Sequence, residues 1–229
     1  MSKIILTLLL LSFIVSACDK KPEKRGFKAN FSEFFMNDTG SFVLYDFNNR
    51  YYLYHNEEKT KEKYTPGQTY IYLAGINFYN KFNNLNLTPS DVSDTSKIKM
   101  LIDSAGLDIQ KKSITDFKYG NLDTAFSTDN FFKNGELKIS VQEQVEFIKE
   151  LYSTNEKFKS IKNNFVTDTI NTRNVSYIVS STGDNSWCTG TVEFGSNLYV
   201  FALNLNSGNK LRALEITQNI LYSFKILED

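Results

Sequence analysis

Histidine is almost absent from this chain, and its scarcity excludes several kinds of chemistry. His55 is the single histidine, and it lies in residues 51–55, which have the composition of a strand. Histidine-based catalytic triads and metal sites built from several histidines are therefore excluded. The sequence also lacks a glycine-rich phosphate loop between a strand and a helix, and its carboxylates are scattered without acid–base spacing. We therefore predict no metal and no other cofactor.

Cysteine is nearly as rare, and neither sign of charge is in excess. The 229 residues include two cysteines, Cys18 and Cys188, and 26 basic residues balance 26 acidic ones. Without a basic surplus there is no electrostatic reason to expect a nucleic-acid partner. Because 41% of the residues are hydrophobic, the chain can bury one substantial core, and its length suggests one main domain.

The first residues have the pattern of a bacterial lipoprotein signal. Lys3 is followed by an apolar run over residues 4–15 and then by two small residues before Cys18. The run is shorter than the roughly 20 residues that a membrane-spanning helix needs, which argues against an uncleaved anchor. We predict that residues 1–17 are removed, that Cys18 is acylated, and that residues 18–26 form a flexible spacer. The folded domain is predicted at residues 27–229.

This export route predicts a membrane-anchored lipoprotein that faces the periplasm or the cell surface, with the choice between inner and outer membrane left open. Lipid on Cys18 leaves Cys188 as the only cysteine of the mature domain, so an intrachain disulfide is excluded. Cys188 is predicted to be a small buried residue on a strand rather than a reactive thiol, because no histidine is near it in the sequence.

Hydrophobic patterns predict strands at both ends of the domain and helices between them. Ser140 and Glu143 form a capping-box sequence that predicts a helix start, and residues 70–82, apolar on all sides, predict a helix in the interior. We predict strands at residues 42–47, 51–55, 175–181, 187–194 and 197–205, and a closing helix at residues 211–224. This order predicts an antiparallel sheet between layers of helices.

Four stretches carry a family resemblance: residues 40–46, residues 64–67, Tyr119-Gly120-Asn121 and residues 137–147. Together they resemble the class D (oxacillinase-type) β-lactamases and the related penicillin-sensing domains. The resemblance covers residues 27–229. It implies the α/β (α+β, three-layer) fold of serine β-lactamases and penicillin-binding transpeptidases. That fold has an antiparallel sheet of five to six strands, flanking helices and a helical subdomain.

The catalytic positions of that family are replaced in this chain. The resemblance places the Ser-x-x-Lys motif, which supplies the nucleophile and its base, at Gln68 and Ile71. The carboxamide of Gln68 is not a nucleophile, and Ile71 can neither accept a proton nor form the carbamate of the class D lysine. The Lys-Thr-Gly motif appears as Ser181-Thr182-Gly183 and has lost its lysine. These changes predict that acyl transfer by the family route is abolished.

Other family positions are retained. Tyr119-Gly120-Asn121 marks a loop of the cleft. The serine of the second motif falls at Ser93 or at Ser90, and either one is alternatively a helix cap.

The resemblance also implies a set of ligand-binding residues. Thr182 would hydrogen-bond a ligand carboxylate, Gly183 would allow close backbone approach, and Trp187 follows them as a tryptophan does in the family. Arg212 matches the arginine that anchors the β-lactam carboxylate, or is a solvated residue of the last helix.

Three functional hypotheses follow. The first is a catalytically inactive pseudoenzyme that binds a ligand or a protein partner. The second is a serine hydrolase or penicillin-binding protein with a relocated nucleophile at Ser90, Ser93 or Thr69. The third is noncovalent binding of a β-lactam or a peptidoglycan-like carboxylate through Thr182 and Arg212.

The relocated nucleophile would need a nearby base. Lys97 follows Ser93 by four residues, a weaker form of serine–lysine spacing. Tyr72 follows Thr69 by three residues, but a phenol with a pKa of about 10 is a poor base at neutral pH.

Overall fold

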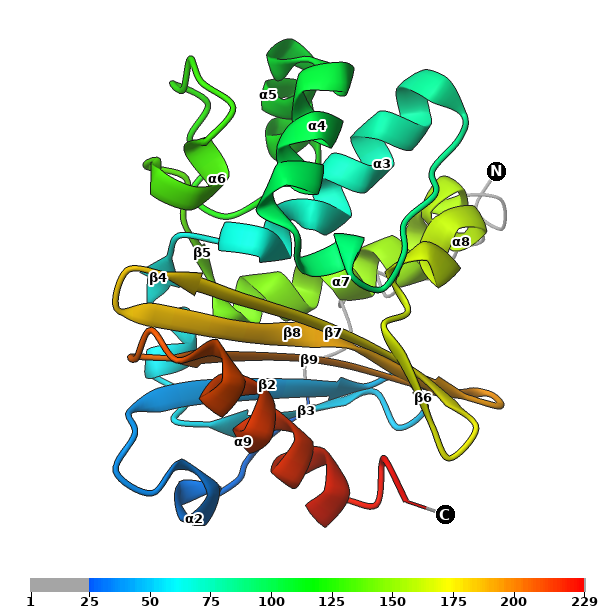
Figure 1. Cartoon of the computed structure of the whole chain (residues 1–229). Coiled ribbons are helices and arrows are strands. Elements are labelled where there is room, and N and C mark those ends of the chain that lie inside the picture. Colours follow the sequence, from blue (N-terminus) through cyan, green and yellow to red (C-terminus); the bar gives the residue numbers. More distant parts are fainter. Residues whose placement is uncertain (1–24, 229) are drawn as a thin grey trace, which may run out of the picture.

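A computed structural model describes residues 25–228, in which one large sheet is covered by helices on both faces (Figure 1). The predicted signal sequence and Cys18 lie outside the described residues. The elements in chain order are β1 (Arg25–Lys28), α2 (Ser32–Phe35), β2 (Gly40–Asp46), β3 (Tyr51–His55), η1 (Lys59–Lys61), β4 (Lys63–Tyr64), η2 (Gly67–Tyr70), α3 (Ile71–Phe82), η3 (Asp91–Ser93), α4 (Thr95–Ala105), α5 (Leu107–Asp116), α6 (Phe131–Asn134), β5 (Ile139–Ser140), α7 (Val141–Thr154), α8 (Glu156–Ile161), η4 (Lys162–Phe165), β6 (Asp168–Ile170), β7 (Arg173–Thr182), β8 (Asn185–Phe194), β9 (Asn197–Leu205) and α9 (Lys210–Ser223).

The main sheet within residues 25–228 has seven strands in the order β1-β3-β2-β9-β8-β7-β6, and β4 pairs separately with β5. The prediction of a purely antiparallel sheet of five to six strands is therefore wrong, because β1 runs parallel to β3. Short strands occupy both edges of the sheet. β6 has only three residues, too few to show a period of two, and β1 begins at Arg25, within the segment predicted as spacer.

The long strands confirm the predictions made from alternation. β2 and β3 form the hairpin predicted from residues 42–55, and β7, β8 and β9 form consecutive antiparallel pairs. The helix predicted at residues 70–82 is α3, preceded by one turn of 3₁₀ helix, and the closing helix is α9. α7 begins with the predicted capping box: the Ser140 hydroxyl accepts from the Glu143 amide, and the Glu143 carboxylate accepts from the Ser140 amide.

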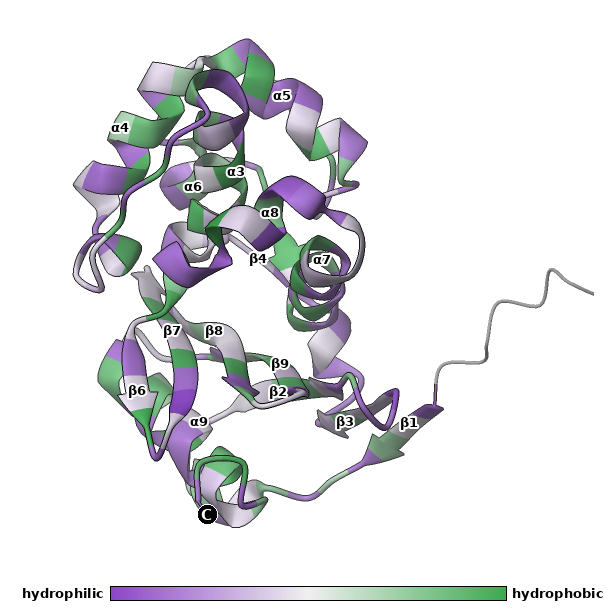
Figure 2. Ribbon diagram, turned by 90° about the vertical axis from the view of Figure 1, so that its right-hand side faces the viewer, coloured by the Kyte–Doolittle hydropathy of each residue, from purple (hydrophilic) through white to green (hydrophobic). Residues whose placement is uncertain are grey.

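Two hydrophobic cores lie on opposite faces of the sheet. Val43 packs into the core shared with α3 and α7, whereas its neighbours Phe42 and Leu44 pack into the core shared with α2 and α9. Figure 2 shows the resulting layers edge-on, with the helical subdomain of α3 to α6 at one end and α9 at the other. The three-layer architecture is the predicted one. No helix within residues 25–228 is long and apolar enough to cross a membrane.

Candidate functional site

The candidate site lies where η2, which leads into α3, packs against β7. Gln68, at the position of the family nucleophile, is held there by two hydroxyls. Its amide Nε2 donates to Thr95 Oγ1 at 2.7 Å, and its Oε1 accepts from the Ser180 hydroxyl. The backbone N–H of Gln68 also donates to Ser180 Oγ at 3.0 Å. We name Gln68, Thr95 and Ser180 the amide–hydroxyl cluster.

The residues that follow Gln68 are buried. Ile71 has no exposed surface and belongs to the core between the sheet and the helices. The Thr69 hydroxyl is also fully buried and donates to the Pro66 carbonyl at 2.7 Å. The hydroxyl of Tyr72 lies 2.9 Å from that of Ser176, and burial raises the pKa of this phenol. No general base is presented to Thr69 by this arrangement.

The two serines of the second motif lie near η3, which contacts both η2 and β7. Ser90 is exposed, and its hydroxyl lies 2.9 Å from that of Thr88. Ser93 ends η3 and is half-buried. The ammonium of Lys97 is 4.0 Å from the Asp91 carboxylate, and no hydrogen bond within the described chain joins it to Ser93. The geometry therefore does not form a serine–lysine pair.

The Tyr119-Gly120-Asn121 loop is bound to the segment before α7. The Asn121 side chain donates to the Glu136 carbonyl at 2.7 Å and accepts from the Lys138 amide at 3.0 Å. Gly120 has a φ of +62°, and a Cβ there would lie 2.1 Å from the Lys138 carbonyl oxygen, so only glycine fits. The buried Tyr119 hydroxyl donates to Gln144 Oε1 at 3.1 Å. These contacts position the loop. The exposed Asn121 side chain is already hydrogen-bonded to backbone groups of the same chain.

The remnant of the third motif ends β7. The Ser181 hydroxyl donates to the Gly208 carbonyl at 2.8 Å, while the half-buried Thr182 hydroxyl has no hydrogen-bond partner within the described residues. Gly183 turns the chain towards β8. Trp187 is fully buried, and its indole N–H donates to the Thr65 carbonyl at 3.0 Å, so its ring supports the segment before η2 rather than facing solvent.

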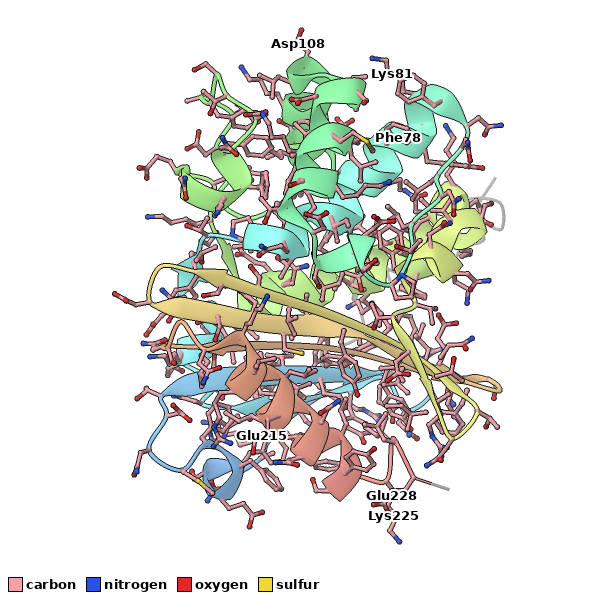
Figure 3. All side chains as sticks on the ribbon, in the orientation of Figure 1. Phe78, Lys81, Asp108, Glu215, Lys225 and Glu228 are labelled. Atoms are coloured by element: carbon pink, nitrogen blue, oxygen red, sulfur yellow. The ribbon has the colours of Figure 1, made fainter. Side chains whose placement is uncertain are left out.

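Arg212 lies at the start of α9 and is directed towards α2. Its Nε donates to the Asp38 carboxylate at 2.8 Å, and one terminal nitrogen donates to the Phe34 carbonyl at 2.7 Å. The other terminal nitrogen is 2.9 Å from the carboxylate of Glu215, which Figure 3 labels on α9. A ligand-anchoring role would therefore require Arg212 to give up partners that hold α2 against α9.

Other chemistry is not supported by the described residues. Within residues 25–228, no three or more histidine, cysteine or acidic side chains are grouped to hold a metal ion. Cys188 is fully buried, and its burial raises the pKa of the thiol to about 12, so the thiol stays protonated. His55 is half-buried against Phe35, with ring centroids 4.5 Å apart, and its Nδ1 accepts from the Phe31 amide.

Two surface hollows of about 500 Å³ each lie apart from the amide–hydroxyl cluster. One is lined by His55, Phe35 and Met36, and the other by Phe126 and Phe131 of the loop around α6. Neither hollow is lined by any of the three cluster residues.

At the position of the family nucleophile, the polar groups are an amide and two hydroxyls, which can hydrogen-bond a ligand.

Thr95 and Ser180 were not identified from the sequence. Thr95 looks like an ordinary first residue of a helix, and Ser180 precedes the motif remnant by one position. Because side chains alternate along a strand, Ser180 points to the other face from Ser181, towards η2. That alternation is the one sequence signal that could have indicated it.

Comparisons with known proteins identify related sequences and similar solved structures. No family model matches the sequence. The methicillin resistance protein MecR1 of Staphylococcus aureus is 28% identical over 230 aligned positions, covering 85% of this chain and 39% of MecR1. The β-lactamase OXA-48 of Klebsiella pneumoniae is 30% identical over 129 positions, covering 51% of this chain and 48% of that enzyme. The chain thus spans about two fifths of MecR1 and half of OXA-48.

Among solved structures, the C-terminal domain of the Bacillus licheniformis BlaR penicillin-receptor superimposes with a TM-score of 0.78 at 21% identity. The superposition covers 90% of this chain and 99% of that domain. The TM-score shows that the two domains share a fold.

Proposed function

We propose that this chain, a homologue of penicillin-sensor domains and class D β-lactamases with the same fold, binds its ligand or partner noncovalently. No acyl-enzyme is formed in this proposal. The observation that carries the proposal is the state of the nucleophile and base positions. Gln68 is held in the amide–hydroxyl cluster, and Ile71 is a fully buried alkyl group.

Acyl transfer in this fold requires an activated hydroxyl at the N-terminus of the central helix. A carboxamide has no nucleophilic oxygen of that kind, and the alkyl side chain of isoleucine cannot take up the proton that the reaction releases. Losing groups that act as a unit leaves little of the rate enhancement. The homology therefore describes descent and scaffold, and the proposed activity is noncovalent.

A relocated nucleophile is the weaker alternative on this geometry. The Thr69 hydroxyl is buried and already donates to a carbonyl, and the ammonium of Lys97 faces the Asp91 carboxylate. Ser93 is half-buried, and no base is bonded to it within residues 25–228. We therefore do not expect Ser93 to be a nucleophile, and its substitution serves only to test that alternative.

The ligand class that we propose is a β-lactam or a peptidoglycan-like carboxylate. The homologous BlaR domain is a penicillin-receptor by name. In this chain the half-buried Thr182 and the cluster residue Ser180 both approach Gly67, and the Thr182 hydroxyl has no partner within the described residues. We further propose that the protein is an exported lipoprotein anchored through Cys18, on the basis of the signal pattern alone. A protein partner is the alternative occupant.

Incubation with a fluorescent penicillin is expected to leave the intact mass of the protein unchanged. The chemical reason is the absence of a nucleophile and base pair, and the measurement is intact-protein mass spectrometry together with hydrolysis of a chromogenic cephalosporin. A class D β-lactamase run in parallel confirms that the reagent acylates. A stable adduct on the wild-type chain would refute the proposal, and its loss in Ser93→Ala would then assign the relocated nucleophile.

Calorimetric titration with benzylpenicillin or a D-Ala-D-Ala peptide is expected to give binding heat that depends on Thr182. Replacing Thr182 with valine removes a hydrogen bond to a charged group, which costs roughly 10- to 100-fold in affinity. Thr128→Val, in the exposed loop before α6, is the matched control and should bind as wild type. If the wild-type chain gives no heat, the carboxylate ligand is ruled out and a protein partner remains.

A further inference from the structure

β1 is an exposed edge strand placed where the chain enters the domain. All four of its residues are exposed, and Phe27 has 55% of its surface accessible. The Phe27 ring contacts Tyr51 edge-on, with centroids 5.6 Å apart, so its position is defined although most of it faces solvent. An exposed aromatic side chain on a defined backbone is suited to lie at a membrane–water interface.

Positive charge is concentrated in the part of the sequence that leads into this strand. Residues 19–28 contain five basic and two acidic residues, whereas residues 29–229 contain 20 basic and 24 acidic residues. Arg50 of the neighbouring chain segment adds one more cation. It is exposed and directly precedes Tyr51, the residue of β3 that pairs with Arg25. Lys28 is partly neutralised by Glu57 at 3.1 Å. A basic segment on an otherwise acidic domain orients that domain towards an anionic surface.

The position of β1 also fits contact with a membrane. Only six residues separate Cys18 from Arg25 in the sequence, and a fully extended segment of that length spans about 20 Å. β1 forms the outermost strand of the sheet, and Figure 2 shows it at the end of the molecule away from α4 and α5. An anchor at Cys18 would therefore bring β1, and not the helical subdomain, to the lipid surface.

We propose that Arg25, Phe27 and Arg50 form a docking surface for anionic phospholipid headgroups. Phe27 enters the interface, and the guanidinium groups pair with phosphate oxygens. The proposal rests on the chain being membrane-attached, which is part of the proposed function, and goes beyond it by fixing which face of the domain meets the lipid.

The test places a tryptophan at the proposed contact. Trp187 is the only native tryptophan and is fully buried, so it supplies a background that lipid quenchers do not reach. The full chain carrying Phe27→Trp is reconstituted into vesicles of brominated phosphatidylcholine with or without phosphatidylglycerol. Phe82→Trp is the matched control, because Phe82 is 48% exposed and follows Lys81, which Figure 3 labels at the opposite end of the molecule.

With phosphatidylglycerol present, we expect quenching of the Phe27→Trp variant to be at least about twofold stronger than in neutral vesicles, and to fall in high salt. The Phe82→Trp variant should be quenched equally weakly in both. Equal quenching of the two variants, or quenching that ignores phosphatidylglycerol, would overturn the docking surface. Vesicle flotation separates the causes: a chain that does not float at all refutes membrane attachment together with docking. The penicillin experiment is independent of both outcomes.

Discussion

Replacing Ile71 with lysine is expected to destabilise the domain by about 3–5 kcal/mol rather than to restore a catalytic base. Ile71 has no exposed surface and sits in the core between the sheet and α3. An ammonium placed there would lack a partner, and burial would lower the pKa of the lysine towards its neutral form. Urea unfolding followed by circular dichroism measures the loss.

Ile71→Met is the matched control, because it preserves volume and apolarity and should cost less than about 1.5 kcal/mol. Combining Gln68→Ser with Ile71→Lys tests the functional side of the same argument. We expect no penicillin adduct in the double variant, since the core does not accommodate the charged base. A stable double variant that acylates would show that the surrounding core still accepts the family chemistry.

Replacing Gly190 with alanine is expected to cost about 3 kcal/mol or more, and thus a large part of the stability of a typical domain. Gly190 lies in β8 opposite Tyr177 of β7, and a Cβ there would lie 1.7 Å from the Ser176 carbonyl oxygen. The contacting carbonyl belongs to the Ser176 backbone in the middle of the sheet, so it cannot move aside without breaking the ladder. Thermal unfolding of the purified variant measures the effect.

Gly183→Ala provides the comparison for Gly190→Ala. Gly183 has a φ of +58°, but a Cβ at this position would have no atom within 4 Å, so alanine there meets only the backbone penalty of roughly 1 kcal/mol. If the two variants unfolded at the same temperature, the close approach of β7 and β8 would not be the reason for glycine at position 190.

The sequence predicted the parts of the fold that repeat a pattern. β7, β8 and β9 alternate over nine or ten residues each, and their predicted limits differ from the observed ones by only a few positions. β6 and β1 were missed because three or four residues carry no clear period, and because the charge of β1 is typical of a spacer. Edge strands are specified by the neighbour that they pair with, which the local sequence does not contain.

The sequence predicts that the catalytic serine and lysine are missing from the candidate site, but it does not predict which residues contact their replacements. The side-chain chemistry of Gln68 and Ile71 is evident from the sequence. The pairing of Gln68 with Ser180, however, depends on the packing of η2 against β7, since the two residues are 112 positions apart in the chain. Arg212 illustrates the same limit: its position matches a ligand anchor, whereas its partners come from the segment around α2. The direction in which a side chain points, and the partner that it bonds, depend on the folded structure.

The order of strands separates the proposed lipid-facing strand, β1, from the proposed ligand-binding strand, β7. Five strand-to-strand steps lead from β1 to β7, which at about 4.8 Å each amounts to about 24 Å across the sheet. A guest held at the end of β7 would therefore stay clear of the bilayer while the opposite margin rests on it. Large molecules such as glycan strands could reach that guest site without detaching the protein from its support.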